Sequence, residues 1–408
     1  MGRDKPHILY LILDGFPTFR PDISALWGRY LPAEGVTSDL STIALEPPEQ
    51  AKPWGGGKVM AFSPPANKIK EQIGGFLHDL RVLRSVRRGD YDAIQVRDKS
   101  FICVPAMITA RRLGIPFFYW MSFPIAESLS LLANRLNPVR DFPRWLFLKV
   151  RGDLGGVLLR RFVLTRADHI FVQSDKMASD LAAIGLPRER MTAVPMCIDP
   201  DRFADPLPSQ SSATSAKTIG YLGECSRVRR IDFLFEALRH VHQTAPDVEL
   251  LVLGDAYEEA DRQWLRQRMA ETGVDERVTI TGWLPADQIV ERFAKVDLAL
   301  ALMAPDPILD STTPTKLVEY LAMGLPVVAN AHPDQCLVLG ESGAGLVTPF
   351  TPVAYGDAIL ELLGDDSRRA EMALKGPAYV AEKRSYPRMA KSLAAAYKTL
   401  LGSRKAVS

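Results

Sequence analysis

The sequence predicts an α/β protein of two Rossmann-like, doubly wound domains that face each other across a cleft. Its 408 residues exceed what one ordinary core holds. Short apolar runs alternate with helical segments twice along the chain, which is typical of parallel sheets with right-handed crossovers. A Pro-, Ser- and Asp-rich stretch without periodicity predicts a linker at residues 201–216. Ligands of such folds bind beyond the carboxyl ends of the strands, so we expect the site in the cleft.

Residues 1–200 form the first predicted domain, whose strands are short apolar runs of the kind that parallel sheets bury. These runs are His7–Gly15, Asp92–Arg97, Pro116–Ser122, His169–Ser174 and Met191–Met196. Residues 217–376 form the second domain, with runs at Thr218–Gly223, Glu249–Gly254, Val278–Gly282, Leu298–Met303 and Pro326–Asn330. Residues 377–408 are expected to form a carboxyl-terminal helix, which the sequence permits, without requiring it, to cross back to the first domain.

Composition excludes several classes of protein. The formal charge is only +2, so no protein-wide basic field indicates nucleic acid as a partner. The four cysteines share no metal-ligand spacing, and free thiols in a reducing compartment fit them best. The first apolar run is too short for a signal peptide or a membrane span. We therefore expect a cytoplasmic protein, or one that lies peripherally on the inner face of the cell membrane.

The stretch "DSTTPTKLVEYLAMGLPVVA", residues 310–329, predicts a helix that begins after a Thr/Pro cluster and ends at Gly324. Ser311 or Thr315 is the expected cap. Two interpretations of its charges stay open. Taken alone, the element favours a surface helix with Lys316 and Glu319 in solvent. Alternatively, the N–H groups at the helix start and Lys316 bind a phosphate, while Glu319 accepts hydrogen bonds from ribose hydroxyls.

The segment "PTKLVEYLAMGLPVVA" resembles the donor-site motif of family-4 glycosyltransferases, which have the GT-B fold of two Rossmann-like domains. Other segments resemble that family in the same order along the chain: "HIFVQSDKMASDLAAIGLPRERMTAVPMCIDPDRF", "GYLGECSRVRRIDFLFEAL" and "RVTITGWLPADQIVERFAKVDLALALMAP". The match is good over about residues 168–370 and weak before them. Several ordered motifs at the expected spacing favour the GT-B fold far more strongly than one helix does.

The resemblance implies a hexosyltransferase-type enzyme. It would move a sugar from a nucleotide-sugar donor to a saccharide or lipid-linked acceptor, with retention, in the synthesis of a bacterial surface polysaccharide. The second domain would bind the donor and the first would present the acceptor. The nucleotide sugar is a substrate, and neither a cofactor nor a metal is expected.

The resemblance also implies the site residues. Family members carry two glutamates eight positions apart; Glu319 matches the second, and Ser311 stands at the first. Arg229 matches the lysine of the second domain's first loop and is the expected pyrophosphate ligand, while Glu224 replaces an arginine. The candidate catalytic residues are Ser311, Lys316, Glu319 and Arg229. The candidate donor-binding residues are Gly15, Gly223, Arg227, Arg229, Gly282, Trp283, Thr313, Thr315, Lys316, Leu317 and Glu319.

Three of these candidates also have a plain structural interpretation. Gly15 follows the first strand where the family often has a glycine pair, and it equally suits a turn with unusual dihedrals. Gly282 and Trp283 follow the strand "VTITG", where relatives contact the nucleotide base; a structural tryptophan is the alternative. The histidine that the family often carries in the first domain is absent from "YWMSFPIAES", so Ser122 or nearby backbone would line the site.

Residues 135–166 form a basic amphipathic stretch, with eight Lys or Arg against two Asp among apolar residues. Such a stretch can lie on anionic lipid headgroups. The alternative is a helix pair that packs its apolar side into the first domain. We favour contact with an anionic membrane surface slightly.

Two alternatives to a glycosyltransferase remain open. One is a different sugar-nucleotide enzyme of the GT-B fold, such as an epimerase. The other is a non-catalytic subunit that binds a partner enzyme, which the departures at Ser311 and Glu224 motivate. A nicotinamide-dependent dehydrogenase is disfavoured because no GxGxxG motif follows any predicted strand.

Overall fold

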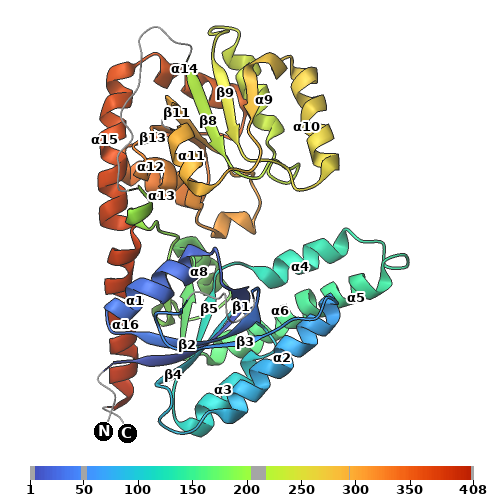
Figure 1. Ribbon diagram of the computed structural model, residues 1–408, viewed down its shortest axis with the longest axis vertical. Coiled ribbons are helices and arrows are strands. Elements are labelled where there is room, and N and C mark those ends of the chain that lie inside the picture. Colours follow the sequence, from blue (N-terminus) through green and yellow to red (C-terminus); the bar gives the residue numbers. More distant parts are fainter. Residues whose placement is uncertain (1–4, 47–52, 204–216, 294, 406–408) are drawn as a thin grey trace. The chain divides into compact units, whose positions relative to one another are not determined.

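The computed structural model describes residues 5–46, 53–203, 217–293 and 295–405 (Figure 1). The chain divides into two compact units. Unit 1 comprises residues 1–196 and 386–408, and unit 2 comprises residues 197–385. Residues 204–216 of the predicted linker lie outside the described residues, and Pro200–Phe203 before them form a short 3₁₀ helix. The predicted α/β architecture with two parallel sheets is confirmed.

Unit 1 contains a seven-stranded parallel sheet in the order β3-β2-β1-β4-β5-β6-β7. Its strands are β1 (His7–Phe16), β2 (Thr37–Ala44), β3 (Val59–Phe62), β4 (Ala93–Arg97), β5 (Phe117–Met121), β6 (His169–Val172) and β7 (Met191–Ala193). The strand order reverses direction between β1 and β4. In doubly wound sheets this switch point opens a crevice at the carboxyl ends of the strands.

The sequence analysis did not predict β2 and β3. The strand β2 carries Ser, Asp and Thr at buried positions, so it lacks the apolar run of a central parallel strand. Tertiary hydrogen bonds satisfy several of these side chains, although the buried Ser38 hydroxyl has no partner among the described residues. Ser41 donates to Asp79 of the helix α2 (Lys68–Ser85), and Thr42 donates to the Asp14 carbonyl. Such partners are distant in sequence and cannot be read from the strand itself.

Helices cover both faces of this sheet. On one face, Leu9 and Leu11 of β1 share a core with residues of α2, of α3 (Cys103–Leu113) and of α8 (Asp175–Ala183). On the other face, aromatic rings from five elements pack together; they are Tyr10, Trp27, Trp120, Phe171 and Tyr397. Tyr397 belongs to α16 (Tyr386–Lys405), so the last helix of the chain is part of unit 1.

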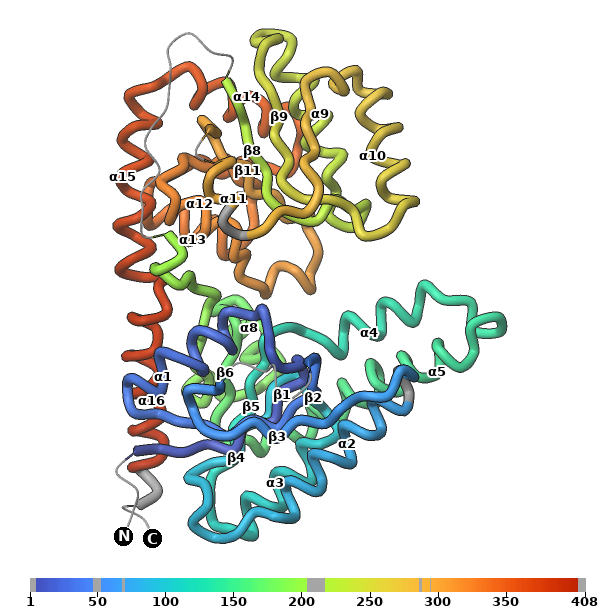
Figure 2. Tube along the Cα trace, in the orientation of Figure 1, coloured from blue at the N-terminus to red at the C-terminus, as the bar shows by residue number. Residues whose placement is uncertain are grey.

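Two helices extend away from the sheet of unit 1 (Figures 1 and 2). These are α4 (Ile125–Asn134) and α5 (Phe142–Lys149), which run beside each other as a hairpin. Helical structure continues from α5 through η2 (Val150–Leu154), α6 (Gly155–Leu158), η3 (Leu159–Val163) and α7 (Leu164–Arg166). The predicted basic stretch therefore covers the tip of this hairpin and its returning arm.

Unit 2 contains a six-stranded parallel sheet in the order β10-β9-β8-β11-β12-β13. Its strands are β8 (Thr218–Leu222), β9 (Glu249–Leu253), β10 (Val278–Ile280), β11 (Leu298–Ala301), β12 (Val327–Asn330) and β13 (Gly345–Thr348). Its helices are α9 (Asp232–Val241), α10 (Glu259–Thr272), α11 (Ala286–Phe293), α12 (Thr315–Ala322), α13 (Pro333–Ser342), α14 (Pro352–Leu363) and α15 (Asp366–Lys383). The switch point lies between β8 and β11. The sequence analysis missed β13, a four-residue edge strand that offers too short an apolar run.

Candidate functional site

Lys316 lies at the switch point of unit 2. It is the second residue of α12, and its Nζ atom lies 5.3 Å from the centre of the Tyr221 ring in β8. Gly223 follows β8 with φ 147°, and a Cβ atom there would lie 1.9 Å from Lys316 Nζ. Only glycine adopts this backbone conformation readily and leaves this space. The ammonium group therefore rests against the loop backbone at the carboxyl end of β8.

Arg229 lies near this ammonium group. Its Nε atom is 3.7 Å from Glu224 Oε2, so the glutamate that replaces the family's arginine forms an ion pair with it. Burial and, after it, the Arg229 charge lower the pKa of Lys316 to about 8, while Glu319 and Glu224 act in the opposite direction. Two cations at one strand end, one of them poorly solvated, favour binding of an anion there.

Glu319 lies one turn after Lys316 in α12. Burial raises the pKa of its carboxyl group, and the charges of Arg202 and Lys316 partly oppose that rise. Within the part of the chain that the structure describes, this carboxylate accepts no hydrogen bond, although it is largely withdrawn from solvent. An acceptor in that condition suits the hydroxyl groups of a ligand. Sequence reasoning missed Arg202, which lies far from α12 along the chain.

The start of α12 differs from the prediction. Neither Ser311 nor Thr315 caps it; the N-cap residue is Pro314, which forms no side-chain cap in the described structure. Ser311 instead belongs to a short 3₁₀ turn and donates to the Ile308 carbonyl at 3.0 Å. The cap prediction is therefore wrong, because the local turn competes for the hydroxyl. The N–H groups of the first turn remain available to an anion.

The other candidates on this stretch differ in exposure. Thr313 is buried, and Thr315 is half-buried at the first position of α12. The Leu317 side chain is fully buried in the core of unit 2, so only its backbone could contact a ligand. The structure thus places Arg229 and Glu319 near Lys316, whose ammonium group lies against Gly223.

Trp283 forms part of an exposed aromatic pair. Its ring stacks on that of Tyr257 with 4.8 Å between the centres and 28° between the planes, and both side chains are exposed. Gly282 before it has φ 77° and bridges to Gly254 after β9. A stacked, solvent-facing pair of rings offers a flat surface for a nucleotide base. Tyr257 was not among the sequence candidates, because its contact with Trp283 joins two separate loops.

Arg227 is directed to α10. Its Nε atom lies 3.2 Å from Asp261 Oδ1, and its guanidinium lies 5.5 Å from the centre of the Trp264 ring. It is therefore engaged away from Lys316, unlike Arg229.

Unit 1 has a buried ionic cluster at its own switch point. Arg97, at the end of β4, lies within 2.6–3.4 Å of the carboxylates of Asp14, Asp22 and Asp98. Asp98 also accepts hydrogen bonds from the backbone and the hydroxyl of Ser122. The sequence analysis did not select Arg97; the unlike charges directly after the apolar run "AIQV" were its only signal.

Gly15 lies in β1 close to this cluster. It pairs with Ile43 beyond an irregularity in the strand, and a Cβ atom there would lie 2.5 Å from Leu45 Cγ. A larger residue would have to displace the exposed Leu45 side chain, so packing favours glycine at this position. This is a structural reason for Gly15, independent of any ligand.

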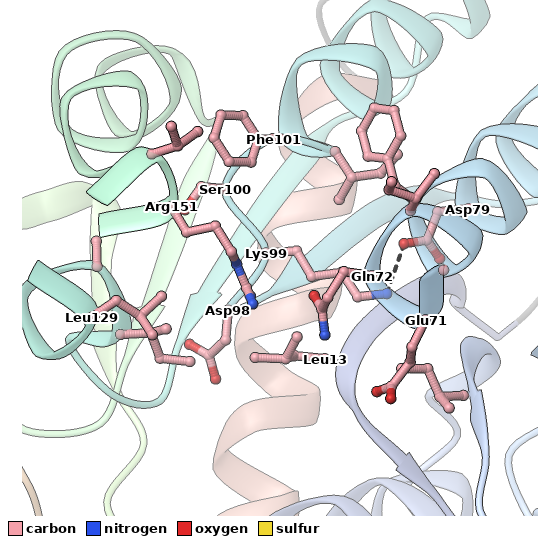
Figure 3. Close-up of a pocket in the computed structure, with 18 of the residues that line it drawn as sticks. Leu13, Glu71, Gln72, Asp79, Asp98, Lys99, Ser100, Phe101, Leu129 and Arg151 are labelled. Atoms are coloured by element: carbon pink, nitrogen blue, oxygen red, sulfur yellow. Dashed lines mark hydrogen bonds and ion pairs between the residues drawn. The ribbon is translucent and has the colours of Figure 1, made fainter. Parts of the chain in front are cut away.

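A cavity of about 430 Å³ opens beside the same strand ends (Figure 3). Leu13 of β1, Ile43 of β2 and Asp98 after β4 contribute to its wall. The helices α2, α4 and α5 close it from the sides, together with η2. This volume lies within the range of sites that bind small molecules. No group of three His, Cys, Asp or Glu side chains that could hold a metal ion occurs among the described residues.

Two protein-family models match the chain. The model described as "Glycosyl transferase 4-like domain" matches residues 25–197, and the model described as "Glycosyl transferases group 1" matches residues 216–365. Together they cover most of the chain. The first match lies in unit 1, apart from its last residue, and the second lies in unit 2.

Several characterised glycosyltransferases are similar in sequence. A D-inositol 3-phosphate glycosyltransferase of Xylanimonas cellulosilytica is 27% identical over 54% of this chain and 54% of its own length. The chain therefore matches only about half of that relative. A 2-deoxystreptamine glucosyltransferase of Streptomyces kanamyceticus is 24% identical over 72% of this chain and 71% of its own length. The amylovoran biosynthesis glycosyltransferase AmsK of Erwinia amylovora is 25% identical over 65% of each chain.

Solved structures share the fold at low identity. Anabaena Alr3699/HepE in complex with UDP has a TM-score of 0.67 and 19% identity, over 96% of this chain and 100% of that one. WaaG, a glycosyltransferase involved in lipopolysaccharide biosynthesis, has a TM-score of 0.65 and 15% identity, over 95% and 98% of the two chains. These likenesses confirm the predicted GT-B fold.

Proposed function

Because this chain belongs to the group 1 glycosyltransferases, with a glycosyl transferase 4-like domain at its amino end, we propose that it transfers a sugar from a nucleotide-sugar donor to an acceptor hydroxyl. One observation carries the proposal. Lys316, Arg229 and Glu319 converge at the switch point of unit 2, where the start of α12 presents free N–H groups. That set of groups matches a diphosphate next to a ribose.

Each part of the donor has a counterpart in this site. The pyrophosphate would lie between Lys316, Arg229 and the first turn of α12. Glu319 would accept from the ribose hydroxyls, and the stacked pair of Tyr257 and Trp283 would cover the base. Complexes of Anabaena Alr3699/HepE with UDP and with UDP-glucose support a nucleotide-sugar donor for this fold.

The reaction would break the bond between the anomeric carbon and the diphosphate oxygen and form a new bond to the acceptor oxygen. Negative charge then develops on the leaving diphosphate, where Lys316 and Arg229 stabilise it. The proton of the acceptor hydroxyl passes to that leaving phosphate. We propose retention at the anomeric carbon on the strength of the resemblance to family-4 enzymes.

The acceptor proposed here is a saccharide or lipid-linked saccharide of a bacterial surface polysaccharide. The similarity to the amylovoran glycosyltransferase AmsK supports this setting. No helix in the described ranges is long and apolar enough to cross a membrane. The α4–α5 hairpin has exposed apolar side chains next to arginines, and we propose that it contacts an anionic membrane surface. These apolar side chains are Leu131, Leu132, Val139, Phe142, Leu146, Leu154 and Val157.

A thermal-shift panel of nucleoside diphosphates, nucleoside monophosphates and nucleotide sugars tests the donor site. One nucleoside diphosphate should raise the melting temperature clearly more than its nucleoside does, because ligands that bind only the folded state stabilise it. The matching nucleotide sugar should do the same. A folded protein that no nucleotide stabilises would favour the non-catalytic, partner-binding alternative.

A further inference from the structure

The cavity of unit 1 is mainly apolar. It lies at the switch point between β1 and β4, which is where doubly wound sheets bind ligands. Its volume is about 430 Å³. The apolar side chains that line it are Leu13, Ile43, Ile73, Phe76, Phe101, Ile102, Ile125, Leu129, Phe147 and Val150. Because apolar surface predominates in this wall, it suits a hydrocarbon group.

Most charges at the cavity are already paired. Lys99 Nζ lies 2.7 Å from Asp79 Oδ2, as Figure 3 shows. Asp98 is held by Arg97 and by the hydrogen bonds from Ser122. Glu71 of α2 lines the cavity and forms no ion pair among the described residues. These paired groups leave Arg151 as the cation available to a ligand.

Arg151 lies in η2 and extends into the cavity (Figure 3). In the part of the chain that the structure describes, it forms no ion pair, and its guanidinium lies 5.3 Å from the centre of the Phe147 ring. Burial lowers the pKa of this side chain, although it stays a cation at neutral pH. A partly desolvated arginine without a counter-ion, surrounded by apolar groups, is a site for an anionic group that carries hydrocarbon.

We propose that this cavity binds the acceptor, and that the acceptor is amphipathic: its hydrocarbon part fills the cavity and its phosphate pairs with Arg151. The proposal rests on the proposed function and specifies the chemical class of its acceptor. Phe76 and Val150 of the cavity wall are partly exposed, and the α4–α5 hairpin, whose helices also line the cavity, carries further exposed apolar side chains. A lipid-borne acceptor would thus meet apolar side chains both at the cavity and on the hairpin.

Calorimetric titration of the full chain with alkyl phosphates tests the proposal. Octyl phosphate, kept below its micelle concentration, should bind at least about thirtyfold more tightly than butyl phosphate, since each buried methylene contributes up to about fourfold. Inorganic phosphate alone should give no saturable binding. Equal affinity for butyl and octyl phosphate would overturn the proposal.

Three variants locate the binding. Arg151→Gln should weaken octyl phosphate at least about tenfold and leave octyl glucoside unchanged, because the guanidinium contacts only the phosphate. Arg84→Gln removes the same charge from an exposed position on α2 outside the cavity and should have little effect. Gly75→Phe should fill the cavity without a clash at its Cβ, since nothing lies within 4 Å of that position, and should abolish octyl phosphate binding. Binding that survives in a folded Gly75→Phe protein would place the ligand on the hairpin surface and overturn the proposal.

Nucleotide binding at the donor site distinguishes failure of the acceptor proposal from failure of the proposed function. If alkyl phosphates fail while a nucleoside diphosphate binds, the acceptor proposal falls alone. If alkyl phosphates bind as expected and no nucleotide does, the glycosyl-transfer proposal falls and the cavity remains a site for anionic amphiphiles.

Discussion

Lys316 connects the electrostatics of the donor site to pH. Its pKa of about 8 reflects burial and the Arg229 charge, so its ammonium group loses its proton in an accessible range. We expect affinity for a nucleoside diphosphate to fall as the pH rises from 7 to 9.5, because the protonated form binds the phosphates. The phosphate itself completes its second ionisation near pH 6 and so contributes little above pH 7.

Calorimetry at several pH values in buffers of different ionisation enthalpy measures this effect. Binding should take up protons above pH 8, because the diphosphate raises the pKa of Lys316. In Lys316→Met the pH dependence should disappear together with part of the affinity. A wild-type slope that Lys316→Met leaves unchanged would assign the titration to another group.

Arg229 is expected to bind the pyrophosphate. Arg229→Ala should weaken a nucleoside diphosphate at least tenfold, since a charge-assisted hydrogen bond contributes roughly 1.5–3 kcal/mol. Affinity for the nucleoside should hardly change, because a nucleoside has no phosphates for Arg229 to bind. Arg239→Ala, an exposed change in the last turn of α9, is the matched control. Equal losses for nucleoside and diphosphate in titration would remove Arg229 from the phosphate site.

Glu319 is expected to bind the ribose. Glu319→Gln keeps the shape of the side chain but removes its charge and one acceptor. Ribonucleotide affinity should therefore drop, while a 2′,3′-dideoxynucleotide should bind both proteins alike. If the substitution weakens the two nucleotides equally in the same titration, Glu319 is structural.

At the scale of elements, the basic stretch of residues 135–166 has two parts: the tip of the α4–α5 hairpin and the arm that returns to the sheet. Leu159, Val163 and Leu164 in the returning arm are buried in the core of unit 1. Lys149 and Arg160 form ion pairs with Asp153 and Glu127. The exposed arginines of the tip, Arg135, Arg140 and Arg144, form no ion pair among the described residues. The interpretation as core packing therefore holds for part of the returning arm, while contact of the tip with a membrane stays a prediction.

The membrane prediction concerns these tip arginines. Replacing Arg135, Arg140 and Arg144 with Gln should weaken binding to anionic vesicles by up to about 3 kcal/mol, at about 1 kcal/mol per cation. The control replaces the exposed Arg84, Arg111 and Arg112, elsewhere on unit 1. Co-sedimentation should also fall steeply with salt, because the attraction is screened. Binding that is independent of salt, or equally lost in the control, would contradict this role.

The strands show how far the sequence predicts the elements. Apolar runs predicted β1 and β4, because most residues of these buried strands are themselves apolar. The strands β2 and β13 have no such apolar run, so the sequence did not predict them. Ser41 in β2 is buried because Asp79 accepts its hydrogen bond, and Gly345–Thr348 is merely a short edge strand. Such elements depend on distant partners, which periodicity does not detect.

The candidate site follows the same division. Lys316 and Glu319 were predicted because their helix resembles the donor-site motif of family-4 glycosyltransferases. The Tyr257–Trp283 contact joins two loops, and the charge of Arg202 acts on Glu319 from a segment far away along the chain, so no local pattern reveals them. Likewise, the cavity around Arg151 is lined by β1, β2, the segment after β4 and several helices.

At the scale of the whole molecule, each unit carries a candidate site at the switch point of its own sheet. Unit 2 has the charged groups expected for a nucleotide, and unit 1 has an apolar cavity with a single available cation among its described residues. The last helix, α16, belongs to unit 1, where the Tyr397 hydroxyl donates to Gln95. The chain thus starts and ends in the unit proposed to bind the acceptor.

The proposed glycosyl transfer is tested most directly by phosphorus NMR of the full chain incubated with a panel of nucleotide sugars, with and without an alkyl phosphate that carries a sugar. One donor should lose its sugar-diphosphate resonances and release its nucleoside diphosphate, faster when the amphipathic acceptor is present. Lys316→Met should slow this release at least tenfold. A folded protein that binds a nucleotide sugar yet leaves every donor intact, with or without acceptor, would contradict the account.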